Sequence, residues 1–137
     1  FPVGTEQLTV TGVLLGAPSH SVLFRDVAAI VNASKTGFQE LQLAAKNQRF
    51  GTYTAPWGAR VDAVAETKVA QAVWHSTQVT QETALKPIKA GDGGQRTIVG
   101  TASFKIGDKP TKTNLVLNKD LRGPGWLWRL THPTEVF

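Results

Sequence analysis

The chain has 137 residues, of which 41% are hydrophobic and 18% charged, and its formal net charge at pH 7 is +5. These values predict one domain, residues 1–137, that can bury an apolar core, and they exclude a disordered chain. Without cysteine, the chain can form neither a disulfide nor a cysteine-bound zinc site. It begins at Phe1 and contains no methionine, so we expect a processing site before it, as in an exported, periplasmic or virion protein.

The composition favours strands. The sequence contains 16 Thr and 14 Val, whose branched side chains fit a pleated sheet better than a helix. Its 13 Gly and 7 Pro divide the chain into short segments. We therefore predict a strand-rich α+β fold, with an antiparallel sheet in the C-terminal half and one or two helices in the N-terminal half. An all-β sandwich is the alternative.

The first predicted element is a hairpin. Residues 8–15 alternate in character, so Leu8, Val10, Gly12 and Leu14 fall on one face. A turn at residues 16–20 would then bring residues 21–24 back as the second arm.

Residues 24–47 allow two interpretations. Apolar residues recur at helical spacing in the first part, at Phe24, Val27, Ala28 and Val31. For residues 37–47 we favour a helix with Thr36 as its N-cap. The alternative is a turn at residues 34–37 followed by a strand.

Residues 60–80 show the longest alternation in the chain. Period two continues from Val61 to Val79, which is longer than a helical stripe would imitate by accident. We predict one long bent strand, or two strands with a tight bend. A helix over the first half is the less favoured alternative.

The C-terminal third is predicted to be an antiparallel meander. Its three strands are expected at residues 96–106, 113–117 and 126–130, each with one apolar face, and glycine-containing turns separate them. In this interpretation Trp126 and Trp128 point into the core.

No catalytic constellation is visible in the sequence. The three histidines, His20, His75 and His132, are too far apart in the sequence to suggest a zinc site. Asp62 and Glu66 share one strand face and are expected to be exposed charges. No serine lies in a Gly-x-Ser-x-Gly motif. We therefore predict a protein that is not an enzyme, with no catalytic residue, metal site or cofactor.

The positive charge is concentrated in the second half of the chain. Residues 1–70 contain six Lys or Arg and five Asp or Glu, whereas residues 71–137 contain nine and five. Basic strands interleaved with hydroxyl and aromatic groups are typical of a sheet face that contacts RNA or DNA. A solvated basic surface without a ligand is the alternative. The predicted nucleic-acid-binding residues are Lys105, Lys109, Lys112, Lys119, Arg122 and Arg129.

One tryptophan lies in a predicted turn. Trp57 is flanked by Pro56 and Gly58, so its ring either covers the core or anchors an interface with a partner. Trp57 is the predicted interface residue.

Residues 96–130 end with Gly-Trp-Leu-Trp-Arg-Leu at positions 125–130. This segment resembles the last strands of NTF2-like domains. The resemblance implies a cone-shaped antiparallel sheet wrapped around a helix, and it assigns no site residue.

These features together predict a structural subunit that self-associates into a homo-oligomer through strand edges or the Trp57 turn. A coat (capsid) protein that contacts nucleic acid through its basic sheet face is one form of this prediction. The alternatives are an NTF2-like interaction domain of the envelope or of a secretion machine, and a small-molecule binder. The binder would have a pocket lined by Phe104, Trp126 and Trp128.

Overall fold

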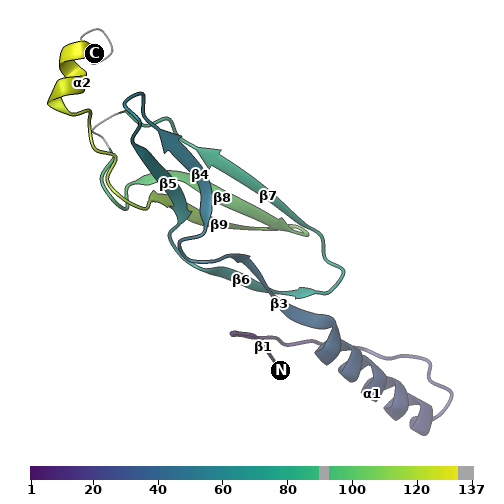
Figure 1. The fold of residues 1–137 in the computed structure, drawn as a ribbon. Helices are drawn as coiled ribbons and strands as arrows, with labels where there is room; N and C mark the ends of the chain where they lie inside the picture. The colour runs from purple at the N-terminus through teal and green to yellow at the C-terminus, as the bar shows by residue number, and fades with distance from the viewer. Residues whose placement is uncertain (90–92, 133–137) are drawn as a thin grey trace. The chain divides into compact units, whose positions relative to one another are not determined.

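The computed structural model describes residues 1–89 and 93–132. The chain divides into two compact units: the first consists of Phe1–Gln42 and Ala70–Gln78, and the second of Leu43–Val69 and the chain from Val79 onward. Both units contain strands; helix α1 belongs to the first unit and helix α2 to the second (Figure 1). The predicted strand-rich α+β class is confirmed.

The first unit begins with a small hairpin and a long helix. Strands β1 (Pro2–Val3) and β2 (Glu6–Gln7) pair antiparallel, and helix α1 spans His20–Gly37. The helix begins where it does because the Ser19 hydroxyl accepts a hydrogen bond from the Val22 amide. The helical spacing predicted from Phe24 onward is thus confirmed.

The predicted hairpin of residues 8–15 with residues 21–24 is wrong. Residues 8–18 contain no strand, and residues 21–24 belong to the first turns of α1. The alternation in residues 8–15 is real, but the cap at Ser19 starts a helix before a return strand can form.

The favoured helix over residues 37–47 is also wrong. Strand β3 (Phe38–Ala44) occupies this segment and pairs with β6 (Val69–Trp74). Thr36 lies in the last turn of α1, where its hydroxyl donates to the Asn32 carbonyl at 3.0 Å. A side chain at Gly37 would overlap the Trp74 ring, so the exit from α1 into β3 needs glycine at this position.

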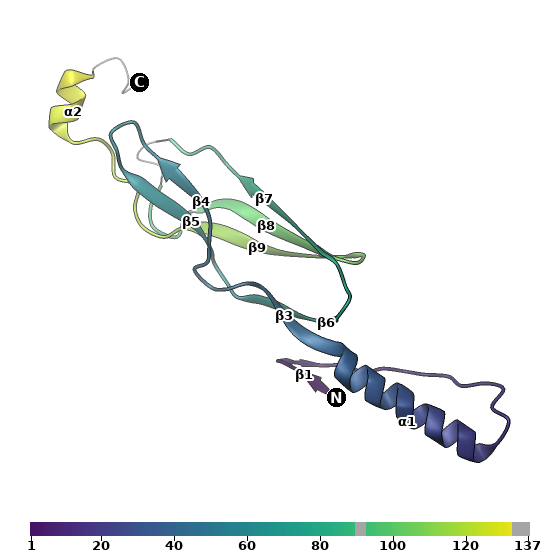
Figure 2. The ribbon, with the colours of Figure 1, turned by 45° about the vertical axis from the view of Figure 1, so that its right-hand side comes forward.

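A five-stranded antiparallel sheet forms most of the second unit. Its strands lie in the order β4 (Arg49–Thr54), β5 (Arg60–Ala65), β9 (Lys109–Leu117), β8 (Ile98–Ile106) and β7 (Val79–Leu85). Figure 2 shows the β8–β9 hairpin between β5 and β7. The predicted strands at 96–106 and 113–117 are confirmed.

Residues 60–80 form strands, as predicted, but not one continuous strand. The segment contains β5 and β6 and the start of β7. The alternative of two strands is therefore correct for residues 60–74, but these strands, β5 and β6, do not pair with each other. β5 joins the five-stranded sheet, whereas β6 pairs with β3.

The sheet of the second unit nearly closes on itself. Tyr53 in the edge strand β4 donates its hydroxyl hydrogen to the carbonyl of Lys86, which follows the other edge strand, at 2.6 Å. Burial raises the pKa of Tyr53 above its ordinary value, so the phenol keeps its proton, and with it this hydrogen bond, further into the alkaline range. This bond ties the two edges of the sheet together.

The core of the second unit lies inside the curved sheet. Alternate residues of β5, β8 and β9 point inward, and each is at most 2% exposed. The Phe104 ring meets the Phe50 ring edge-on, with centroids 6.2 Å apart. The inward residues of the three strands are Val61, Ala63, Ala65, Ala102, Phe104, Leu115 and Leu117.

The third predicted strand of the meander is wrong. Trp126–Thr131 form helix α2, with Gly125 as the N-cap. Trp126 is 73% exposed and Leu130 is 70% exposed, so neither is a core residue. In a segment of six residues, four of which are apolar (Trp126, Leu127, Trp128 and Leu130), the pattern is too short to distinguish a strand from a helix that has apolar residues on both sides. The motif that resembles NTF2-like domains therefore lies on a helix and not on a last strand.

Candidate functional site

The histidines and carboxylates of the described residues do not gather into a metal site. No group of three or more His, Asp or Glu side chains in residues 1–89 and 93–132 could hold a metal ion. His20 starts α1, His75 follows β6, and His132 follows α2. The features described below are the basic residues, the Trp57 turn and two exposed apolar surfaces.

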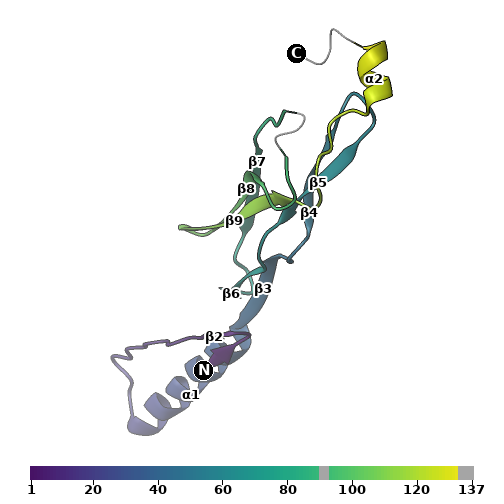
Figure 3. The ribbon, with the colours of Figure 1, turned by 90° about the vertical axis from the view of Figure 1, so that its left-hand side faces the viewer.

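The structure divides the six predicted nucleic-acid-binding residues into two groups. Lys105, Lys109 and Lys112 lie near the turn that joins β8 and β9. The other three follow the far end of β9, in the segment that leads into α2 and in α2 itself. Figure 3 shows α2 beside the β4–β5 turn, at the opposite end of the sheet from the β8–β9 turn. The sheet does not gather them into one patch.

The group at the β8–β9 turn is divided again by the pleat. Lys112 lies opposite Ser103, so it is on the outer face of the sheet, as is Lys105. Lys109 lies opposite Ile106, on the face that continues into the core. Glu82 also pairs with Ser103, so an acidic side chain lies in the same row as Lys112 and reduces the positive potential there. Binding of nucleic acid at this face stays a prediction.

Trp57 lies against the C-terminal segment. Its indole N–H donates to the Arg122 carbonyl at 3.0 Å, and its ring is 5.7 Å from the Trp128 ring. Trp128 in turn stacks on His132 at 4.6 Å. These contacts hold α2 at the β4–β5 turn. Phe104 is enclosed in the core, whereas Trp126 is 73% exposed on α2 and Trp128 packs on Trp57, so the three residues do not line one pocket.

The outer face of α2 is apolar and bordered by cations. Trp126, Leu127 and Leu130 are 73%, 62% and 70% exposed. Arg129 lies on the same helix, and Arg122 precedes it by one short turn of chain. Large apolar side chains are rarely exposed together without a partner.

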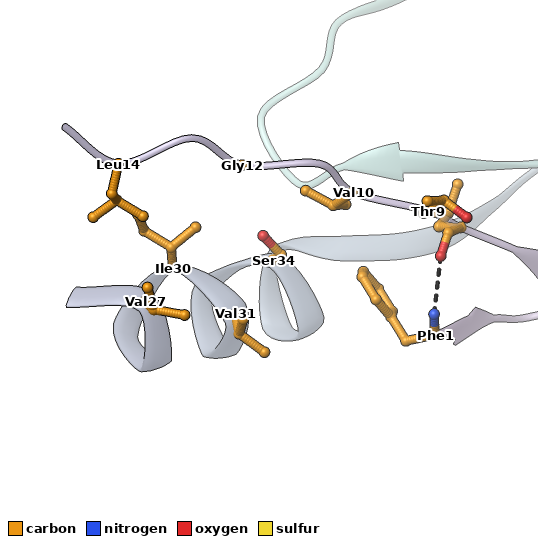
Figure 4. Close-up of a pocket in the computed structure, with 10 residues that line it drawn as sticks. Phe1, Thr9, Val10, Gly12, Leu14, Val27, Ile30, Val31 and Ser34 are labelled. Atoms are coloured by element: carbon orange, nitrogen blue, oxygen red, sulfur yellow. Dashed lines mark hydrogen bonds between the residues drawn. The ribbon is translucent and has the colours of Figure 1, made fainter. Parts of the chain in front are cut away.

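A second apolar surface lies in the first unit, which we call the α1 groove. Residues 8–14 run along α1 and, together with Phe1, enclose a hollow of ≈ 460 Å³ (Figure 4). Leu8, Val10, Gly12 and Leu14, the residues predicted to share one face, all line it. From the helix, Val27, Ile30, Val31 and Ser34 complete the lining.

The helical spacing in the sequence marks the residues of this groove, but it does not show that they stay exposed. Phe24 is 70% exposed, and Leu15, in the extended segment, is 90% exposed. Sequence periodicity identifies an apolar face without identifying what covers it.

The sequence matches no protein-family model and no curated protein. Among solved structures, the fold is similar to part of penicillin binding protein 5 from Haemophilus influenzae. The TM-score is 0.52 at 11% sequence identity, and the match covers 80% of this chain and 33% of that one. The chain thus spans about a third of the length of that protein, and the likeness is one of fold.

Proposed function

We propose that this chain is a non-enzymatic docking module of a larger assembly, and that the α1 groove is the surface through which it docks. The observation that carries this proposal is the exposure of one continuous apolar stripe on a long helix. A helix of 18 residues in a globular protein normally buries such a stripe. In α1, only Gly37 is buried among the described residues.

The extended segment beside α1 suggests the kind of partner. In the described part of the chain, residues 8–15 pair with no strand beyond the bonds that join Leu8 to Phe1. Their side chains nevertheless alternate, and Val13 and Leu15 point away from the groove with exposures of 81% and 90%. An extended segment with free backbone groups and apolar residues on both faces fits the edge of an existing sheet. We infer that the partner supplies such an edge.

An adjoining domain of a longer protein is the partner that we favour over a second copy of this chain. The support is the likeness of fold to a part of a protein about three times longer. Self-association through strand edges, as the sequence predicts, is the competing proposal, and the same experiment distinguishes the two.

Amide hydrogen exchange tests the docking proposal. In the 137-residue chain alone, we expect the amides of residues 9–15 to exchange within about tenfold of the unstructured rate. In the protein as its gene encodes it, pairing with a sheet edge should slow them by about a hundredfold or more. The amide of Phe104, which is already in the sheet, should be protected in both samples.

Equal exchange of residues 9–15 in the two samples would contradict docking at a sheet edge. Protection that rises with the concentration of the 137-residue chain, together with a dimer in light scattering, would favour self-association instead.

The exposed face of α2 favours a second function, attachment to an anionic membrane surface. Trp and Leu next to Arg are typical of helices that lie in the lipid interface, where the rings enter the headgroup region and the cations meet phosphates. Among the described residues, no helix is both long and apolar enough to cross a bilayer. We propose that α2, with six residues, lies along the membrane surface.

Cosedimentation with vesicles tests this second proposal. The pair Trp126→Ala and Leu130→Ala should weaken binding to vesicles that contain phosphatidylglycerol by about tenfold or more, because each side chain loses insertion energy. The matched control is Val13→Ala with Leu15→Ala, which removes equally exposed side chains that have no adjacent cation in the sequence. Equal loss in both pairs would contradict a specific α2 contact.

A single-stranded oligonucleotide serves as the competing ligand. Replacing Lys119 and Arg122 by Ala should weaken binding both to the oligonucleotide and to the anionic vesicles. Binding to the oligonucleotide but not to the vesicles would support the predicted nucleic-acid contact instead.

A further inference from the structure

A polar hollow of ≈ 700 Å³ lies on the outer face of the five-stranded sheet. Its floor is formed by Val64 in β5 and Val116 in β9, which lie directly opposite each other and are 5% and 4% exposed. Both side chains point away from the core, since the inward face of β5 is formed by Val61, Ala63 and Ala65. The hollow thus has a small aliphatic floor in the middle of the sheet.

Two arginines stand on opposite sides of this floor. Arg49 lies opposite Val64 on β4. Arg96 comes from the loop before β8, and its backbone N–H donates to the Leu117 carbonyl at 2.9 Å. Within residues 1–89 and 93–132, neither guanidinium has a hydrogen-bond or ion-pair partner.

The two carboxylates of the hollow are held by neutral groups. Asp62 accepts a hydrogen bond from the Thr52 hydroxyl at 2.8 Å, and Glu66 accepts one from the Asn114 amide at 3.0 Å. Neither forms an ion pair with an arginine in the described part of the chain. Two arginines and two carboxylates thus line the hollow, and within the described residues no ion pair joins them, so the guanidinium groups are open to a ligand.

The backbone fixes the position of Arg96. Arg96 has φ of +67°, and Asn47, on the opposite side of the hollow, has φ of +65°. They are the only non-glycine residues with positive φ in the described part of the chain. Such conformations cost energy for most residues and persist where surrounding contacts fix them. Asn tolerates this region better than most residues, whereas Arg gains nothing from it.

We propose that this hollow binds a carboxylate attached to a short aliphatic body, with Arg49 and Arg96 holding the carboxylate and the two valines contacting the body. Guanidinium groups bind carboxylates through paired charge-assisted hydrogen bonds. The aliphatic floor fits the side chain of a peptide's C-terminal residue, and the amide groups at the rim would also fit the hydroxyl groups of a sugar acid. The group recognised in both ligands is the carboxylate.

An NMR titration of the 15N-labelled chain tests the site. The probes are the acetylated dipeptide alanyl-leucine and glucuronate, each compared with its uncharged counterpart, the dipeptide amide and glucose. We expect saturable shifts of the amides of Arg49, Gln95 and Arg96 with at least one acid, and none with its neutral partner. The acid that binds more tightly identifies the source of the carboxylate.

Substitutions then test the role of the arginines. Arg49→Gln combined with Arg96→Asn should raise the Kd by about tenfold, because two charge-assisted contacts are lost. Asn keeps the left-handed backbone of position 96 accessible. The matched control is Arg60→Gln, which removes the same charge from the same sheet outside the hollow. Arg49→Gln alone, on an exposed strand position, keeps the test valid if the double variant does not fold.

Three results would overturn the proposal. One is the absence of saturable shifts with both acids, and another is equal binding of the acids and their neutral counterparts. The third is an unchanged Kd in the Arg49 variants, or a loss of affinity that Arg60→Gln reproduces.

Discussion

Phe104→Ala should lower the free energy of unfolding by about 3–5 kcal/mol, because it leaves a cavity inside the curved sheet. Phe104 is 2% exposed, and its ring packs edge-on against Phe50. The strands on both sides of β8 hold the cavity open, since β7 and β9 are each paired with it along most of its length. Urea unfolding followed by circular dichroism measures the change.

The control for this prediction is the same substitution at Phe24. That side chain is 70% exposed on α1, so Phe24→Ala should change the stability of the chain by no more than about 0.5 kcal/mol. Similar losses for the two variants would contradict the placement of Phe104 in the core.

Gly100→Ala is expected to have the second largest effect, a loss of about 1–3 kcal/mol of stability. A Cβ atom at this position would overlap the Ala84 carbonyl oxygen and lie 3.1 Å from the Leu85 Cα. Both obstacles are backbone atoms of the neighbouring strand β7, which cannot turn away as a side chain can. The β7–β8 pairing would have to shift to accommodate the methyl group.

Gly12→Ala is the matched control, because nothing lies within 4 Å of its Cβ position. This substitution should be neutral or slightly stabilising, since it restricts the unfolded chain. Thermal unfolding of the two variants measures the difference. Equal melting temperatures would show that β7 does not approach β8 as closely as described.

The apolar side chains of the core are covered by the chain itself, whereas those of the exposed apolar surfaces are not. The second unit encloses its own core, whereas the groove of α1 and the face of α2 leave large apolar side chains in solvent. A surface of this kind is stabilised when another surface covers it. This difference is why we place the proposed docking function on the α1 groove and the proposed membrane contact on α2.

The two arginines of the polar hollow were not identified as site residues from the sequence. Arg49 and Arg96 are 47 positions apart and belong to no motif. They meet at one hollow only because β9 lies beside β5 and the loop before β8 bonds to the end of β9. Asp62 and Glu66 lie at one hollow, as their shared face predicts, but they are half-buried and not freely exposed. Their neutral partners, Thr52 and Asn114, depend on strand pairing.

The amino-acid sequence by itself determined the strand-rich class, the β8 and β9 strands and the helical spacing of α1. In these segments the alternation or the helical period is long enough to indicate one structure, and local caps and turns agree with it. Tertiary structure decided residues 38–44 and 126–131. There a short apolar pattern fits both a helix and a strand, and the outcome depends on whether a neighbouring strand is present to pair with the backbone. β6 supplies that partner for β3, whereas no described strand pairs with residues 126–131, so their backbone groups bond within a helix.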